Sequence, residues 1–167
     1  GTAGAGGSLV LSRYAAQNGG LTLVITENSQ QAERLQAESA FFGGQTALLE
    51  FPDWEILPYD NFSPHQDIIS RRLTTLTGLP SAEKAMLIVP VSTLLHKLVP
   101  LTYIRGMSLR LEVGQQLNLA AMRRELEAAG YLCVESVYEH GEFAVRGSIL
   151  DIFPMGGVEP VRIELFD

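Results

Sequence analysis

The first hundred residues contain apolar segments that alternate between helical and extended spacing. Ser8–Gln17 has helical spacing, and Leu21–Thr26 (LTLVIT) is a continuous apolar run, typical of a parallel strand that is buried on both faces. Asn28 offers an N-cap for the next helix, with Gln31 at capping-box spacing. Two further strands and two further helices are predicted over Thr46–Phe51, Met86–Val91, Asp67–Leu79 and Ser92–Lys97. This order predicts an α/β layer built on a parallel sheet.

From about residue 105 the pattern becomes that of a smaller α+β unit. Ser108–Val113 alternates as a strand would, and Asn118 is placed to cap a helix that reaches Ala129. Three later segments read as successive antiparallel strands: Tyr131–Tyr138, Phe143–Phe153 and Pro160–Phe166. We therefore predict two domains, residues 1–104 and residues 105–167. The chain ends directly after strand-like VRIELF, which predicts a piece of a longer protein.

Composition excludes several classes of protein. The 167 residues are 46% apolar, enough for a core, and 12 basic against 19 acidic residues give a net charge of -7. This charge argues against a general nucleic-acid-coating protein. The single cysteine, Cys133, cannot form an internal disulfide, and no apolar run is long enough for a membrane helix. We expect a protein of the reducing cytoplasm that does not bind membranes.

The residues before the first predicted helix resemble a nucleotide-binding loop. Gly1, Gly6 and Ser8 match the pattern G-x-x-x-x-G-K-[ST], but Gly7 stands at the lysine position. Without the lysine, the negative charge of a bound triphosphate would lack its main protein cation. The segment is therefore either a degenerate P-loop or an ordinary glycine-rich start of the chain, and an active P-loop is disfavoured.

Other catalytic constellations are missing from the sequence. His65, His96 and His140 have no metal-ligand spacing, and there is no G-x-S-x-G nucleophile motif. Cys133 lies in an apolar strand pattern, where a thiol is usually a small buried side chain. We therefore expect no enzymatic activity, no metal and no cofactor for this chain.

Three segments together resemble a known family. They are WEILPYDNFSPHQDIISRRL at residues 54–73, LIVPVSTLL at 87–95, and EHGEFAVRGSILDIFP at 139–154, which RIELFD follows at 162–167. The chain is similar over essentially its whole length to the N-terminal part of bacterial transcription-repair coupling factors. That part is homologous to the excinuclease B subunit (UvrB). The string R-G-x-x-x-D-I-F-P is shared in outline with that subunit.

The resemblance implies a fold, partners and site residues. Residues 1–104 would form a RecA-like α/β domain with a degenerate P-loop, and residues 105–167 the start of a domain that binds the excinuclease A subunit (UvrA). Contacts with RNA polymerase and double-stranded DNA, and the ATP-driven translocase motor, would belong to other parts of the full-length protein. The family's partner-binding positions correspond to Arg146, Arg162 and Phe166. Leu165 departs from the aromatic that often precedes the last of these. The chain itself is expected to be a monomer.

Alternatives to this binding-module hypothesis remain at the level of sequence. The chain could be a residual helicase domain, which Gly7 and the lack of a DExx box disfavour, or a sensor of damaged DNA, which the net charge disfavours. The two arginines could instead be solvated and paired with Glu142 or Glu164, and Phe166 could belong to a core. Strand alternation places Arg146 with Ser148 and Leu150 on one face, opposite Val145, Gly147, Ile149 and Asp151, and it places Arg162, Glu164 and Phe166 together.

Overall fold

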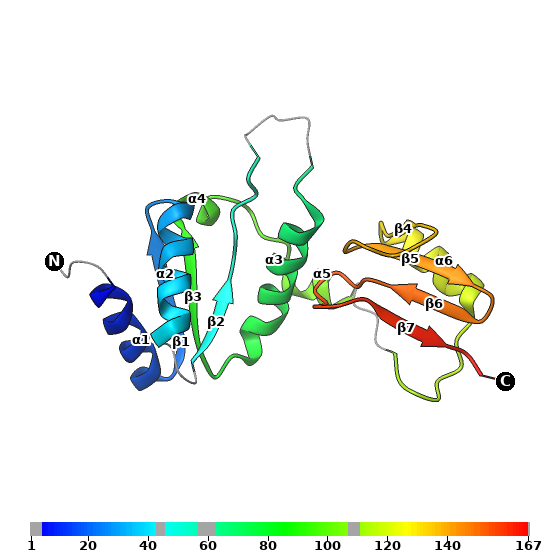
Figure 1. Cartoon of the computed structure of the whole chain (residues 1–167), viewed down its shortest axis with the longest axis horizontal. Coiled ribbons are helices and arrows are strands. Elements are labelled where there is room, and N and C mark those ends of the chain that lie inside the picture. Colours follow the sequence, from blue (N-terminus) through cyan, green and yellow to red (C-terminus); the bar gives the residue numbers. More distant parts are fainter. Residues whose placement is uncertain (1–4, 43–45, 57–62, 107–110, 167) are drawn as a thin grey trace. The chain divides into compact units, whose positions relative to one another are not determined.

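The computed structural model describes residues 5–42, 46–56, 63–106 and 111–166, shown in colour in Figure 1. The chain forms two compact units, one of residues 1–64 and 75–99 and the other of residues 65–74 and 100–167. Helix α3 (Gln66–Gly78) contributes residues to both units. The domain boundary after residue 104 stays a prediction.

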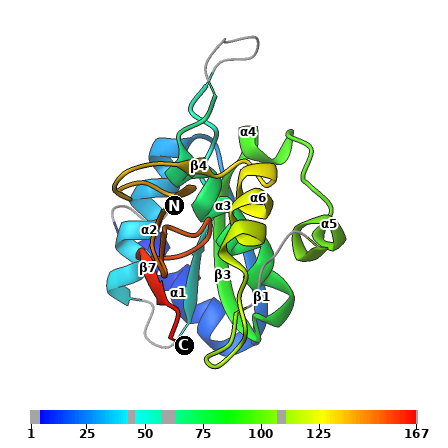
Figure 2. The same ribbon diagram turned by 90° about the vertical axis from the view of Figure 1, so that its right-hand side faces the viewer.

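The first unit contains a three-stranded parallel sheet in the order β1-β3-β2 (Figure 1, Figure 2). This confirms the predicted α/β layer; its RecA-like character stays a prediction. The helix predicted over Ser92–Lys97 is only a single turn, α4, which begins one residue earlier, at Val91. The elements are α1 (Gly6–Asn18), β1 (Gly20–Thr26), α2 (Ser29–Phe42), β2 (Ala47–Glu50), the 3-10 turn η1 (Leu79–Ser81), β3 (Lys84–Pro90) and α4 (Val91–Leu94).

The central strand β3 is the most buried of the three. Every residue from Ala85 to Val89 is buried, with α1 and α2 packed on one face and the end of α3 with η1 on the other. The prediction that LTLVIT is buried on both faces is wrong, because β1 is an edge strand and only its α1/α2 face is covered. Its uncovered face exposes Leu21, Leu23 and Ile25.

Asn28 caps α2 as predicted. Its Oδ1 accepts a hydrogen bond from the Gln31 N–H at 2.9 Å. The Gln31 Oε1 accepts from the Glu27 N–H at 2.9 Å, one residue before the position that the capping box predicts. The predicted cap of α6 is also confirmed, since Asn118 Oδ1 accepts from the Ala121 N–H at 3.0 Å.

The second unit contains a four-stranded sheet in the order β4-β5-β6-β7, with α6 on one face (Figure 1). Helix α5 was not predicted. The predicted strand Ser108–Val113 lies partly outside the described residues, and residues 111–113 are not a strand. The elements are α5 (Leu101–Gly106), α6 (Leu119–Ala128), β4 (Leu132–Cys133), β5 (Glu142–Arg146), β6 (Ile149–Ile152) and β7 (Val161–Glu164).

The predicted run of antiparallel strands is wrong for the first pair. β4 and β5 are parallel, whereas β5, β6 and β7 pair antiparallel. The connection 134–141 returns the chain to the start of β4, so that Glu142 pairs with Leu132 and both strands run in the same direction. Cys133, expected to be buried, is exposed at this edge of the sheet.

The core of the second unit lies between the sheet and α6. Phe143 is 0% exposed, and it packs with buried Met122, Leu126, Leu150 and Ile152. The side chains that face α6 come from alternate positions of β5, β6 and β7. The alternate residues of these strands, among them Ala144, Asp151 and Arg162, therefore lie on the opposite face of the sheet.

Part of the string SPHQDIISRRL has a structural role. The Gly156 N–H donates to Ser70 Oγ at 2.8 Å, and Thr74 Oγ1 donates to the Gly156 carbonyl at 3.1 Å. His140 places one ring nitrogen 2.7 Å from Asp67 Oδ1 and the other 3.0 Å from the Gly157 carbonyl oxygen. These bonds join the loop before β5 and the loop after β6 to the first half of α3, so the string stabilises the second unit.

Candidate partner-binding site

A two-residue turn at Gly147-Ser148 joins β5 to β6 and decides which side chains share a face. Gly147 has φ 61°, a left-handed conformation that glycine adopts without strain. Asp151 pairs with Ala144 on one side and with Arg162 on the other, and Arg146 lies two residues after Ala144. Because cross-strand partners project to the same face, Arg146, Asp151 and Arg162 share one face.

This arrangement corrects the predicted alternation. Arg146 was expected to share a face with Leu150 and to lie opposite Asp151, as along one continuous strand. The turn ends the strand at Arg146, so the alternation restarts in β6. Leu150 is buried against α6, and Asp151 lies on the arginine face.

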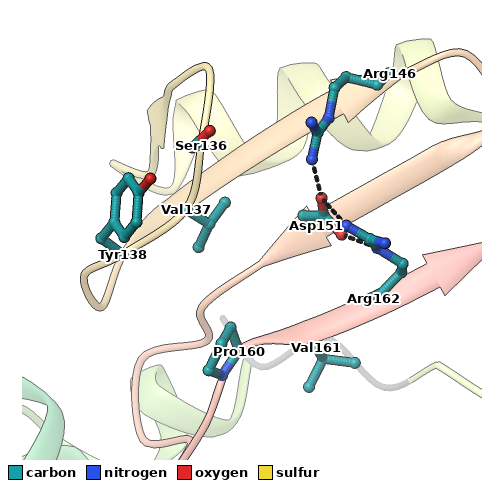
Figure 3. A pocket seen from close by; sticks show the side chains of 8 residues that line it. All are labelled: Ser136, Val137, Tyr138, Arg146, Asp151, Pro160, Val161 and Arg162. Atoms are coloured by element: carbon teal, nitrogen blue, oxygen red, sulfur yellow. Dashed lines mark hydrogen bonds and ion pairs between the residues drawn. The ribbon is translucent and has the colours of Figure 1, made fainter.

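The Asp151 carboxylate binds both predicted arginines (Figure 3). Arg146 Nη2 donates to Asp151 Oδ2 at 2.6 Å. Arg162 Nε donates to Oδ1 at 2.6 Å, and its Nη2 donates to Oδ2 at 3.0 Å. The Asp151 side chain is 13% exposed, compared with 58% for Arg146 and 55% for Arg162. The three residues therefore form one cluster that presents two guanidinium groups to solvent.

The arginines keep Asp151 ionised. Hydrogen bonds from Arg162 and then Arg146 lower the pKa of Asp151 to about 2, and the same contact raises the pKa of Arg162. Because the pKa of Asp151 is lower in the folded state, its stabilising contribution is complete above about pH 4 and is lost as the pH falls towards about 2. The cluster is thus fully charged at neutral pH.

A hollow of about 450 Å³ opens beside this cluster. Glu142, one of the two acids that the alternative hypothesis pairs with the arginines, instead accepts the N–H groups of Tyr138 at 2.8 Å and Glu139 at 2.9 Å and so fixes one wall. Figure 3 shows the lining side chains. They are Ser136, Val137, Tyr138, Arg146, Asp151, Pro160, Val161 and Arg162.

Phe166 lies beyond β7 and does not line the hollow. Its side chain is 87% exposed, so the alternative that it packs in a core is wrong for this structure. The structure thus brings Arg146 and Arg162 together and leaves Phe166 outside their cluster. The sequence analysis did not identify Asp151 as part of this site. The dipeptide Gly147-Ser148 is a hairpin-turn signal, and a hairpin at this position would have placed Asp151 on the same face as Arg146.

The glycine-rich start differs from a working P-loop in a second respect besides Gly7. Gly1 lies outside the described residues, while Gly6, Gly7 and Ser8 begin α1. The buried Ser8 hydroxyl donates to the Glu38 carboxylate, which also accepts from Arg34 Nε at 2.8 Å. The Ser8 and Arg34 bonds lower the pKa of Glu38. An ionised carboxylate therefore holds the hydroxyl that a P-loop would direct at magnesium.

Among residues 5–42, 46–56, 63–106 and 111–166, no three His, Cys, Asp or Glu side chains are grouped so that they could hold a metal ion. None of the helices in these ranges has the length and apolar character needed to cross a membrane.

Comparison with known proteins identifies what the chain is similar to. Residues 109–167 match the family model of the UvrB interaction domain. Transcription-repair-coupling factors are 47% identical over 96% of the chain in Haemophilus influenzae, 44% over 98% in Escherichia coli K12, and 35% over 96% in Staphylococcus aureus USA300. The chain spans 14% of the length of each of these relatives. The chain is thus homologous over nearly its whole length to a segment of the transcription-repair-coupling factors, within which its residues 109–167 match the UvrB interaction domain.

Proposed function

We propose that this chain is a recruitment module for nucleotide excision repair. Its second unit binds the excinuclease A subunit through Arg146, Arg162 and Phe166, and so brings repair to lesions where RNA polymerase has stalled. The whole protein would contact RNA polymerase and double-stranded DNA, and would use ATP, through parts outside this chain. The observation that carries the proposal is the pair of exposed arginines, held by one carboxylate, within a UvrB interaction domain.

The residue types of the surface support a protein partner. Arginine and aromatic side chains are enriched at the residues that dominate interface energies. The two guanidinium groups border a hollow whose other walls include Tyr138, Pro160 and Val161, a mixture of charged and apolar surface that suits a protein contact. A charged chain with a net charge of -7 also repels the phosphate backbone of DNA.

A pull-down tests the proposed function directly. The purified chain, immobilised through a tag, is expected to retain the purified excinuclease A subunit from solution at physiological salt. Beads that carry an unrelated acidic protein of similar size are the control for nonspecific retention. Equal retention on both kinds of bead would contradict the recruitment function.

We further predict that the chain does not bind ATP measurably. Gly7 supplies no cation for the phosphates, and the ionised Glu38 next to Ser8 repels them. Calorimetric titration with ATP is expected to give no binding heat with or without magnesium, and thermal melts should be unchanged by nucleotide. Saturable binding at micromolar ATP would instead favour the alternative of a residual nucleotide-dependent helicase domain.

A further inference from the structure

Asp151 is the least exposed member of the arginine cluster and the only one bonded to both of the others. Its two carboxylate oxygens accept three N–H groups at 2.6 to 3.0 Å, one from Arg146 and two from Arg162. Its side chain is only 13% exposed. Such a residue is poorly placed to make a large contact with a partner, so its role must be sought in what it does to the arginines.

The bonds to Asp151 leave part of each guanidinium group available. Arginine carries five N–H donors, of which Arg146 uses one and Arg162 two in these bonds. The remaining donors can bind acceptor groups of a partner. A long, free arginine side chain loses rotamer freedom when it binds, whereas one that is already held loses less.

We propose that Asp151 is a positioning residue of the partner surface. It holds the guanidinium groups of Arg146 and Arg162 side by side, so that both are oriented before the partner arrives. This inference rests on the proposed function, in which these arginines bind the excinuclease A subunit. The two possible roles of the carboxylate predict opposite changes in affinity when it is removed. Loss of a positioning carboxylate weakens binding, whereas loss of one that merely lowered the positive charge of the surface would strengthen the binding of an acidic partner.

The substitution Asp151→Asn tests this role because it removes the charge with little change of shape. We expect the Kd for the excinuclease A subunit to rise about tenfold, because two arginine side chains would then have to be ordered when the partner binds. Glu127→Gln is the matched control. It removes the carboxylate that binds Arg123 Nε at 2.9 Å on α6, on the other face of the sheet, and should leave the Kd unchanged.

A second measurement reports on the arginines without the partner. In the parent chain, the Nε–H of Arg162 bonds to Asp151 and should give an NMR signal that exchanges slowly with water. Asp151→Asn should lose this signal while the backbone amide spectrum of the second unit stays the same. Asp151→Glu, which keeps the carboxylate, should retain the signal and recover most of the binding.

The outcomes separate this inference from the proposed function. If Arg146→Ala and Arg162→Ala weaken binding but Asp151→Asn binds as well as the parent or more tightly, the positioning role is wrong and the proposed function stands. Equal losses in Asp151→Asn and Asp151→Glu, with the Arg162 signal retained in the latter, would also overturn it. If neither arginine variant weakens binding, the proposed surface itself is wrong.

Discussion

Alanine at Arg146 or at Arg162 is expected to raise the Kd for the excinuclease A subunit roughly thirtyfold. Each substitution removes a guanidinium group from a side chain that is more than half exposed and leaves Asp151 with one arginine partner. Truncation of an interface arginine at a hot spot typically costs about 2 kcal/mol, which corresponds to that change in Kd. Calorimetry or surface plasmon resonance would measure it, with circular dichroism to show that the fold is unchanged.

Arg123→Ala is the matched control for both variants. Arg123 is similarly exposed, at 54%, and similarly paired with a single carboxylate, but it lies on α6, which covers the opposite face of the sheet. Arg110, on the strand predicted from sequence, lies outside the described residues and is a weaker control. Parent-like binding by both arginine variants would place the recruitment surface elsewhere, whereas an equal loss in Arg123→Ala would point to a general charge effect.

Phe143→Ala is expected to destabilise the second unit by about 3 to 5 kcal/mol. Phe143 is 0% exposed and contacts the core residues of α6 and β6, so alanine leaves a cavity that neighbouring side chains cannot fill. Urea unfolding followed by circular dichroism would measure the loss. An effect of this size is comparable to the whole stability of a small domain, so the variant should also lose binding to the excinuclease A subunit.

Phe166→Ala removes the same side chain from a position that is 87% exposed. Its free energy of unfolding should change by no more than about 0.5 kcal/mol, as is usual for surface substitutions. Its binding should nevertheless weaken, if Phe166 contacts the partner as proposed. A loss of stability similar to that of Phe143→Ala would show that Phe166 packs in a core and would remove it from the proposed surface.

Most elements of the fold could be predicted because their signals are local. The helices that Asn28 and Asn118 cap depend on side-chain bonds to N–H groups three residues away, and the apolar run of β3 is continuous within the sequence. α4, by contrast, has no side-chain cap and is shorter than predicted, and α5 was not predicted. The exposure of Leu21, Leu23 and Ile25 was not predictable, because an edge strand and a central strand can have the same apolar sequence and differ only in their neighbours.

The sequence by itself determined that the chain has an α/β layer followed by a smaller α+β unit and that Gly7 stands where a P-loop needs lysine. Its family resemblance, and not its periodicity, named Arg146, Arg162 and Phe166 as candidate binding residues. Only the tertiary structure decided that Asp151 joins these arginines, that Glu142 does not, and that Glu38 binds Ser8. The physical reason is that alternation fixes faces only along one strand. A turn at Gly147-Ser148 and the pairing of β6 with β7 set which side chains meet across strands.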